Sequence, residues 1–592
     1  MGEAIWWAFL RLTDPGYLGD DQGNWRRFIS TLLTLAGYVI FLGSLVAIIT
    51  TWMNRKIRHL EQGLTPVTAN NHMVILGWSN RTIHIAAEIF QSAGNLKRLF
   101  EKLNIKKLQL IILSEEVSPF QMQDPMIGRK AHEIILRTGM AIDREHLRRV
   151  DALNASVIII PSLAYDRKEL INPDIETIKC LLSLNAEARK FNITNLPYVV
   201  AEIQDDNKIN AAYRSYNGPL EIIGSNAIIS RLMAQNIRHP GLSQVYNELL
   251  AQLTKNNIFT KEFPEAIDFS FGAVKKAFSS AIVVGIVKEE KGKYIPLLNP
   301  DRKQKIESGD QLIFISRKYS DLEADLEILE NDILEFSNKN PLQVEEQGEV
   351  NRILILGWNE HVPSLIKELT TYEDESYFIR LVSLKPLQER TKDFGIFNEI
   401  PERIVIDHIV ADYVRESVIK RIEVTTFDHI LMLSSDRMEE EEEADARTMV
   451  GFVLIEEILE NSNKTPSILL ELADPSNESL LKPFQSEVII SPMVLSHLLA
   501  GIAMQRELYS IYNELFTVGG PEMIFRKIEE YAMNGSTATF FELEAQAESH
   551  GETALGIFIE RAHGKELLLN PAKDLVLNLS EVDSLVILTT VY

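Results

Sequence analysis

The amino-acid sequence predicts a membrane pore helix and one transmembrane helix, followed by two α/β Rossmann-like domains that each end in a small α+β lobe. Two observations support this fold class. An uncharged stretch long enough to cross a membrane precedes most of the chain. A pattern of apolar strands and amphipathic helices then occurs twice. The copies open with Met-Val-Ile-Leu-Gly-Trp and Ile-Leu-Ile-Leu-Gly-Trp, and their glycines, Gly77 and Gly357, lie 280 positions apart.

Later segments of the two copies recur in the same order, with small drift in their offsets. Glu-Ile-Gln-Asp in the first copy corresponds to Glu-Leu-Ala-Asp in the second, and Tyr-Asn-Glu-Leu and Leu-Asn-Pro each occur in both copies. The matched segments are 202–205 with 471–474, 246–249 with 512–515, and 298–300 with 569–571. Ordered repeats of this kind indicate duplicated domains rather than chance matches.

Length and composition limit the classes of protein that need to be considered. A chain of 592 residues exceeds the size of a single hydrophobic core, and its 45% apolar and 24% charged residues are ordinary for a folded protein. The net charge of −24 argues against a nucleic-acid partner, which requires a basic face. The single cysteine, Cys180, excludes a disulfide framework and fits a reducing compartment.

Residues 28–53 contain no charged side chain and are long enough to cross a bilayer. As a helix they would extend about 39 Å, against a hydrocarbon core of roughly 30 Å. A signal peptide does not fit, because the stretch is too long, begins late and lacks a small-residue cleavage pattern after it. Arg55, Lys56 and Arg58 follow immediately, which predicts a cell-membrane protein with both large domains in the cytosol.

Two glycines, Gly37 and Gly43, lie inside the predicted transmembrane helix. Glycine permits either close helix packing or a bend. Either role suits a helix that lines a pore, and we expect these two positions to act as the hinge of a gate.

The segment before the transmembrane helix is apolar and aromatic over two to three turns, with Trp6 and Trp7 near its start, and breaks at Asp-Pro-Gly. It is too short to span a bilayer. One interpretation is an interfacial helix with tryptophan anchors. The other is a re-entrant pore helix followed by an ion filter of backbone carbonyls and acidic side chains. The predicted filter residues are Thr13, Asp14, Pro15, Gly16 and Tyr17.

Each copy alternates apolar strands with amphipathic helices, the pattern of a parallel, doubly wound sheet. The predicted strands of the first copy are 73–76, 108–113, 133–136, 157–160 and 198–203. Those of the second copy are 353–356, 378–383, 403–406, 429–433 and 467–472. Ligands of such a sheet bind at the carboxyl ends of the strands, where Gly77 and Gly357 lie.

Each copy then continues into short strands joined by turns, which predicts a compact α+β lobe. The expected strands are 281–287, 294–298 and 311–315 in the first lobe, and 554–559, 566–569 and 584–588 in the second. The expected division of the whole chain is 1–27, 28–54, 55–71, 72–238, 239–335, 336–350, 351–500 and 501–592. These ranges are the pore helix with its filter turn, the inner helix, a linker, the first Rossmann-like domain and its lobe, a second linker, and the second domain and its lobe.

The glycine signature for a dinucleotide is weak in both copies. A phosphate-binding loop needs Gly-x-Gly-x-x-Gly, and each copy has only the first of these glycines. The candidate cofactor-binding residues are Gly77, Trp78, Ser79, Asn80 and, for a ribose hydroxyl, Glu115. Because Trp78 would crowd a phosphate and Glu360 would repel one, a bound nucleotide is doubtful.

Acidic residues offer a second type of regulatory site. The run 436–445 lies at a predicted helix start and is explained by the helix dipole, since a continuous run on a helix cannot converge on one ion. Asp205 and Asp206 follow a strand in a loop, where side chains can converge, and Asp474 occupies the matching place in the second copy. We therefore name these three aspartates as the candidate metal ligands, with calcium as the candidate ion.

Several segments resemble the CASTOR/POLLUX cation channels, whose chains carry tandem regulator-of-potassium-conductance (RCK, TrkA-N-like) domains. The resemblance covers nearly the whole chain. Its segments are Trp-Trp-Ala-Phe-Leu at 6–10, Asn-His-Met-Val-Ile-Leu-Gly-Trp-Ser at 71–79, Ser-Arg-Leu-Met at 230–233, Pro-Gly-Leu at 240–242 and Leu-Asn-Pro at 569–571.

The resemblance implies a homotetrameric, ligand-gated cation channel for potassium or calcium, whose cytosolic domains form a gating ring. It implies cations and the lipid bilayer as partners, and calcium as one regulatory ligand. Two departures limit it. Family members carry outer membrane helices before the pore helix, so this chain is expected to be a fragment or to lack a functional pore. The turn at 13–17 shares only Asp14 and Gly16 with the plant filter.

Two other interpretations compete with a channel. A membrane-tethered TrkA-like subunit could regulate a separate cation transporter, but it leaves the tryptophan-rich helix without a role. A membrane-bound oxidoreductase lacks the full glycine motif, and the sequence contains no nucleophile elbow, P-loop or paired metal-ligand spacing. The sequence therefore favours a channel over an enzyme.

Overall fold

The structure of the chain is a computed structural model. The structure describes residues 2–61, 63–92, 98–99, 107–115, 117, 133–162, 172–250, 256–331, 350–394, 400–434, 441–460, 462, 464–481, 486–517, 519–531, 533, 535–561 and 564–590. Most of the expected linker 336–350 and the first part of the acidic run 436–445 lie outside these residues.

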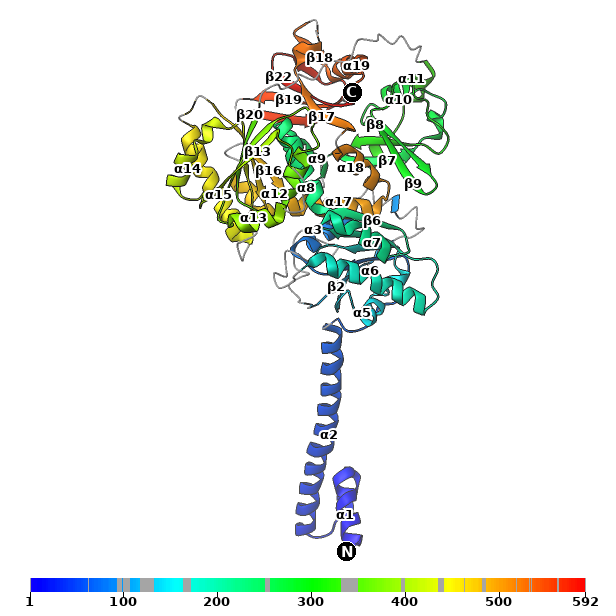
Figure 1. Ribbon diagram of the computed structural model, residues 1–592. Coiled ribbons are helices and arrows are strands. Elements are labelled where there is room, and N and C mark those ends of the chain that lie inside the picture. The colour runs from blue at the N-terminus through cyan, green and yellow to red at the C-terminus, as the bar shows by residue number, and fades with distance from the viewer. Residues whose placement is uncertain are drawn as a thin grey trace.

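A helical hairpin stands apart from the rest of the molecule (Figure 1). Helix α1 (Gly2–Thr13) is followed by a 3₁₀ helix (Pro15–Asp20) and by the long helix α2 (Asn24–Glu61), along which α1 packs. Residues 24–57 of α2 have the length and apolarity of a membrane span, and only 11% of this apolar stretch is buried in the structure. Because α2 continues to Glu61, the expected linker 55–71 is helical in its first part.

The first Rossmann-like sheet contains six parallel strands in the order β3-β2-β1-β4-β5-β6. The strands are β1 (Met73–Leu76), β2 (Leu110–Ser114), β3 (Ile134–Thr138), β4 (Val157–Ile160), β5 (Tyr198–Ile203) and β6 (Leu220–Gly224). Its helices include α3 (Asn80–Gln91), α5 (Arg144–Arg149), α6 (Pro173–Lys190) and α7 (Ile209–Ser215). Continuous apolar strands, buried on both faces, explain why this sheet is parallel.

The second sheet repeats this order as β13-β12-β11-β14-β15-β16, again all parallel. Its strands are β11 (Asn351–Leu356), β12 (Tyr377–Ser383), β13 (Ile404–Val410), β14 (His429–Met432), β15 (Ser467–Leu472) and β16 (Glu487–Ile490). Its helices include α12 (His361–Leu369), α13 (Leu387–Phe394), α14 (Glu416–Ile422), α15 (Glu441–Leu459) and α16 (Glu478–Leu481). The tandem Rossmann-like fold is confirmed, and each sheet gains a sixth strand, β6 or β16, that the sequence analysis missed.

Each copy ends in a four-stranded antiparallel sheet, β7-β10-β8-β9 or β17-β22-β19-β20. The first contains β7 (Asn257–Glu262), β8 (Ile282–Glu290), β9 (Lys293–Leu298) and β10 (Gln311–Ser316), with α10 (Phe271–Lys276) and α11 (Leu326–Asn331). The second contains β17 (Pro521–Arg526), β19 (Thr553–Arg561), β20 (Gly564–Leu569) and β22 (Val582–Thr590), with α19 (Phe540–Ser549) and a small pair of β18 (Thr537–Thr539) and β21 (Val576–Asn578). Strands β7 and β17 were not expected.

The two copies exchange the helices that follow their sixth strands. Helix α8 (Ser225–Arg238) of the first copy packs on α12 and β15 of the second, and α17 (Ser491–Met504) of the second packs on α3, β4 and β5 of the first. One hydrophobic core therefore runs through both copies. The expected domain boundary at residue 500 falls inside α17; the chain turns at Gln505 instead, before α18 (Leu508–Phe516).

The turn after each exchanged helix is held by a glutamate of the other copy's sixth strand. Glu487 of β16 accepts hydrogen bonds from Asn236 Nδ2 (2.7 Å), Gly241 N (2.9 Å) and Ser243 Oγ (2.8 Å). Gly241 lies in the turn between α8 and α9 (Leu242–Leu250), and Ser243 lies at the start of α9. Glu221 of β6 instead forms an ion pair of 2.7 Å with Arg506, between α17 and α18. The two copies are thus locked together by a pseudo-symmetric pair of contacts.

Candidate functional site

The expected ion filter lies in the turn that joins α1 to α2. Thr13 is the last residue of α1 and donates from Oγ1 to Phe9 O at 2.9 Å. The exposed Asp14 caps the following 3₁₀ helix, because its Oδ1 accepts from Gly16 N at 2.8 Å. Pro15, Gly16 and Tyr17 belong to that 3₁₀ helix, so this segment is a compact turn rather than an extended row of carbonyls. Its role as a filter stays a prediction.

A buried charge pair, missed by the sequence analysis, fixes this turn. Arg11 donates to Asp21 from Nε (3.1 Å) and Nη2 (3.0 Å), and Trp7 Nε1 donates to the same carboxylate at 3.0 Å. Arg11 is 5% exposed and Asp21 3% exposed. Two charge-assisted bonds from one guanidinium hold the two ends of the turn together. The spacing of Trp7 and Arg11, one helical turn apart, was the only sequence signal for this clamp.

The two candidate hinge glycines have different surroundings. A Cβ on Gly37 would lie 1.8 Å from Leu12 O, so glycine is required there for α1 to approach α2. A Cβ on Gly43 would meet nothing within 4 Å. Helix α2 continues unbroken through both positions. Gly37 is therefore a packing glycine in this structure, and the hinge role of both residues stays a prediction.

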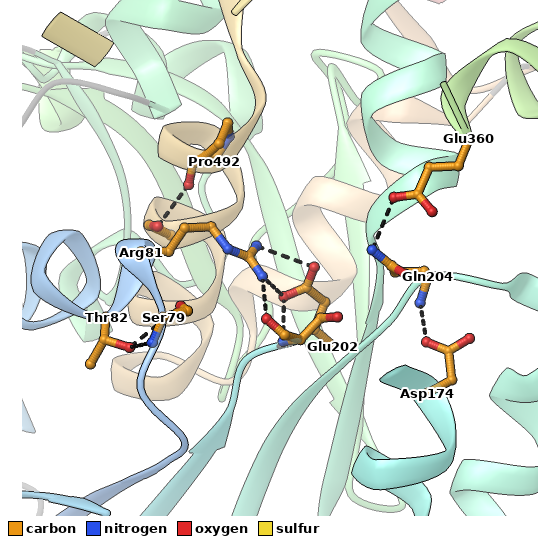
Figure 2. Close-up of polar contacts among 10 residues, drawn as sticks. Ser79, Arg81, Thr82, Asp174, Glu202, Gln204, Glu360 and Pro492 are labelled. Carbon is orange, nitrogen blue, oxygen red and sulfur yellow. Dashed lines mark hydrogen bonds and ion pairs between the residues drawn. The ribbon is translucent and has the colours of Figure 1, made fainter. Parts of the chain in front are cut away.

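The candidate nucleotide cleft of the first copy begins at Gly77, whose φ of +119° suits glycine. Trp78 is half-buried against the core, and Ser79 begins a capping box with Thr82, whose Oγ1 accepts from Ser79 N at 2.8 Å (Figure 2). Asn80 is the first residue of α3, and Glu115 is exposed in the bend after β2. The start of α3 is thus capped by its own side chains.

A fully buried ion pair lies beside this capped helix start. Arg81 Nη2 is 2.7 Å from Glu202 Oε2 and also donates to Ser162 O at 2.9 Å, and Ser162 N donates to the same Glu202 oxygen at 2.9 Å (Figure 2). Arg81 comes from α3, Glu202 from β5, and Ser162 follows β4, so the pair sits at the carboxyl ends of neighbouring strands. An internal carboxylate at this point disfavours a phosphate beside it.

The second copy has the same arrangement with a different cation. His361 Nδ1 is 2.7 Å from Glu471 Oε1, and that carboxylate also accepts from Asn359 Nδ2 (2.7 Å) and Ser491 Oγ (2.6 Å). Burial alone would lower the pKa of His361, but the Glu471 carboxylate outweighs it and raises the pKa above its ordinary value. Burial opposes ionisation of Glu471, yet His361 and the two neutral donors lower its pKa overall.

This difference predicts a pH dependence at the second cleft that the Arg81–Glu202 pair of the first cleft lacks. Because the pKa of His361 is raised, its stabilising contribution is complete below its ordinary pKa of 6.5 and is lost as the pH rises through the raised value. The lowered pKa of Glu471 removes its contribution only as the pH falls below its ordinary value of 4.5. We expect amides of α12 and β15, corrected for intrinsic exchange rates, to lose hydrogen-exchange protection several-fold as the pH rises from about 6 through the raised pKa of His361.

The internal control is the first copy, since an arginine keeps its charge throughout this range. Protection of β5 should not follow the same curve, and His361→Gln should flatten the curve of α12. Equal pH dependence in both copies would contradict this assignment.

The candidate calcium ligands have local structural roles. Asp205 caps the 3₁₀ turn after β5 and pairs with Lys208 at 3.1 Å, and Asp474 caps the matching turn after β15. Asp206 is half-buried, and burial raises its pKa. Within the part of the chain that the structure describes, no group of three or more His, Cys, Asp or Glu side chains is placed to hold a metal ion. The calcium role of these aspartates stays a prediction.

The first cleft faces the second copy directly. Gln204, which follows Glu202 on the same strand end, donates from Nε2 to Glu360 Oε1 at 2.9 Å (Figure 2). Ser230 Oγ of α8 donates to His361 O at 3.0 Å, and Arg238 bridges Glu375 (2.7 Å) and Glu522 (2.8 Å). The strand ends of one copy are therefore coupled to the first helix of the other.

Comparisons with known proteins agree with this architecture. Residues 226–331 match the family described as "Castor and Pollux, part of voltage-gated ion channel". The chain is 24% identical to the ion channel CASTOR of Lotus japonicus, over 96% of this chain and 68% of that protein. It is also 24% identical to the calcium-gated potassium channel TvoK of Thermoplasma volcanium, over 54% of this chain and 83% of that one.

Among solved structures, the gating ring of human SLO3 has the same fold. The TM-score is 0.62 at 15% sequence identity, over 88% of this chain and 100% of that chain. The resemblance to the CASTOR/POLLUX channels, expected from short motifs, is confirmed over almost the whole sequence. The chain spans about two thirds of the length of its plant relatives, 68% of CASTOR and 64% of POLLUX from Lotus japonicus.

Proposed function

We propose that this chain, which resembles the CASTOR/POLLUX ion channels along nearly its whole length, is one subunit of a ligand-gated cation channel. Four copies would line the ion path with α1, its turn and α2, and their paired Rossmann-like domains would form a ring on the cytosolic side of the membrane. Ligand binding in the ring would change its diameter and move α2. The permeant ion would be potassium or calcium.

The observation that carries this proposal is the direct attachment of α2 to the first Rossmann-like domain. Thr138 N, at the end of β3, donates to Gly63 O at 3.1 Å, and Val67 N donates to Arg149 O at 2.8 Å. Only one residue separates Gly63 from the end of α2 at Glu61. Because the connection is short, a displacement of this edge of the sheet would move the end of α2.

Two exposed apolar helix faces support assembly of the Rossmann-like domains into a ring. On α6, Ile175 is 47% and Leu182 50% exposed, and on α15, Val450 is 48% and Val453 47% exposed. The two helices occupy matching places, between the fourth and fifth strands of their sheets. Matching apolar faces suit contacts between neighbouring subunits. The candidate calcium site and a nucleotide in either cleft belong to this proposal as candidate ligands.

Ion flux and single-channel recording of the full chain in liposomes test the proposal. We expect potassium or calcium flux and a change in open probability when calcium, NAD or ADP is added on the side of the lobes. Flux with unchanged open probability under every ligand would contradict ligand gating. Absence of flux in correctly inserted tetramers would contradict the channel itself and favour a membrane-tethered regulatory subunit.

A further inference from the structure

Two arginines of the first Rossmann-like domain flank the linker that follows α2. Gly63 has a φ of +63°, and a Cβ at this position would lie 3.1 Å from the Cα of Arg137. Val67 donates its backbone N–H to Arg149 O, as described above. Arg137 lies near the end of β3 and Arg149 at the end of α5. Both side chains therefore start from backbone that contacts the linker.

These two arginines are close to each other and have no acidic partner in the described part of the chain. Arg137 Nη1 donates to Leu136 O at 2.7 Å, and Arg149 donates to Thr138 O. Burial and then the charge of Arg149 lower the pKa of Arg137, because each effect disfavours its charged form. Two half-buried guanidinium groups that repel each other are stabilised by a shared anion.

The pair belongs only to the copy that carries the linker. In each sheet the third strand pairs with the second and the second pairs with the first, and this register defines equivalent positions in the two copies. Arg137 pairs with Leu113 in the first sheet, and Ile409 pairs with Val382 in the second. Ile409 therefore occupies the place of Arg137 in the second copy. Arg421, the sixth residue of α14, matches Arg149 of α5 but has no second arginine beside it at that position.

The arginines also lie on the side of the first Rossmann-like domain that contacts the linker from α2. The exposed apolar surface of α2 continues to Ile57, and Arg55 and Lys56 are exposed beside it. Gly63 lies roughly 6–13 Å beyond Ile57, from four helical residues and two further residues. A headgroup layer is about 5–8 Å thick on each side of the bilayer, so the linker lies at the outer edge of this layer or just outside it. Figure 1 shows α5 next to the end of α2 from which the linker starts.

We propose that Arg137 and Arg149 bind the phosphate group of an anionic phospholipid in the leaflet at the C-terminal end of α2. Of the other charges of α5, Arg148 pairs with Glu187, Arg144 is an exposed cation at the opposite end of the helix from Arg149, and Glu145 is an exposed acid, while Asp143 caps the helix start. The proposal rests on α2 spanning a membrane and not on ion conduction. A lipid bound at the linker would favour one position of the first Rossmann-like domain relative to α2.

Native mass spectrometry of the full chain in detergent, titrated with phosphatidylglycerol or phosphatidylcholine, tests the proposal. At about 1 kcal/mol for each arginine near the surface, Arg137→Gln with Arg149→Gln should weaken phosphatidylglycerol binding roughly 30-fold. Phosphatidylcholine binding should not change. The charge-retaining variant Arg137→Lys with Arg149→Lys should keep most of the preference, and Arg421→Gln is the matched control that should keep all of it.

Three results would overturn the proposal. The first is equal phosphatidylglycerol binding by the wild type and the double glutamine variant. The second is an equal loss with Arg421→Gln. The third is competition by millimolar inorganic phosphate that displaces the lipid completely, which would assign the site to a free anion. None of these readouts depends on flux, so a lipid site without conduction, or conduction without a lipid site, can be recognised.

Discussion

Replacement of Arg81 by methionine is expected to destabilise the first Rossmann-like domain by about 3–5 kcal/mol. The reason is that Glu202, with a side chain that is 0% exposed, would be left in the core without its cation. Removing one member of a buried pair costs far more than the pair itself contributes, because the remaining charge is desolvated and unpaired. Hydrogen exchange of β4 and β5, together with the thermal unfolding midpoint in detergent, measures the effect.

Two further variants separate an unpaired charge from simple loss of packing. Arg81→Met combined with Glu202→Met should recover much of the lost stability, since neither charge is then buried. Lys420→Met breaks an exposed ion pair with Glu416 and should leave the midpoint unchanged. A double variant that is less stable than Arg81→Met alone would show that the carboxylate has another essential partner.

If the chain conducts ions as proposed, replacement of Gly37 by valine is expected to abolish conduction while both Rossmann-like domains and their lobes stay folded. A side chain at this position collides with Leu12 O, a backbone atom that can move only if α1 moves. An overpacked contact costs about 1–3 kcal/mol, which lowers the equilibrium constant for docking of α1 on α2 roughly 5- to 160-fold. Ion flux in liposomes and a spin-label distance between α1 and α2 report the change.

Gly43→Val provides the matched control, because its side chain would meet nothing within 4 Å in the subunit. Flux should be retained in this variant, and the unfolding midpoint of the lobes should be equal in both. If Gly43→Val removed flux as completely as Gly37→Val, the packing role assigned to Gly37 would be wrong and a hinge role for both glycines would be favoured.

The sequence predicted the repeated sheets because their strands are short apolar runs that end at a recurring Gly-Trp. It could not predict which sheet α17 would cover. Nearly all residues of α17 are buried, so its sequence indicates burial on all sides without indicating the partner. The exchange with α8 arises from contacts between residues far apart in the sequence, which periodicity does not encode.

The candidate site shows the same limit. Glu202 and Glu471 were recognised as recurring landmarks, yet their cations, Arg81 and His361, were not, because 121 positions separate Arg81 from Glu202. The clefts were instead interpreted by comparison with a phosphate-binding loop. A recurring glutamate at the end of a buried strand was the available signal, since a buried carboxylate requires a partner.

The exchange of α8 and α17 has a consequence for biosynthesis. The first sheet is nearly complete when β5 leaves the ribosome, but the helix that shields it, α17, is made about 300 residues later. At the usual pace of translation this delay lasts roughly 15–60 s. During that time the nascent chain presents an unshielded apolar surface, and chaperone capture is therefore expected at this stage of synthesis.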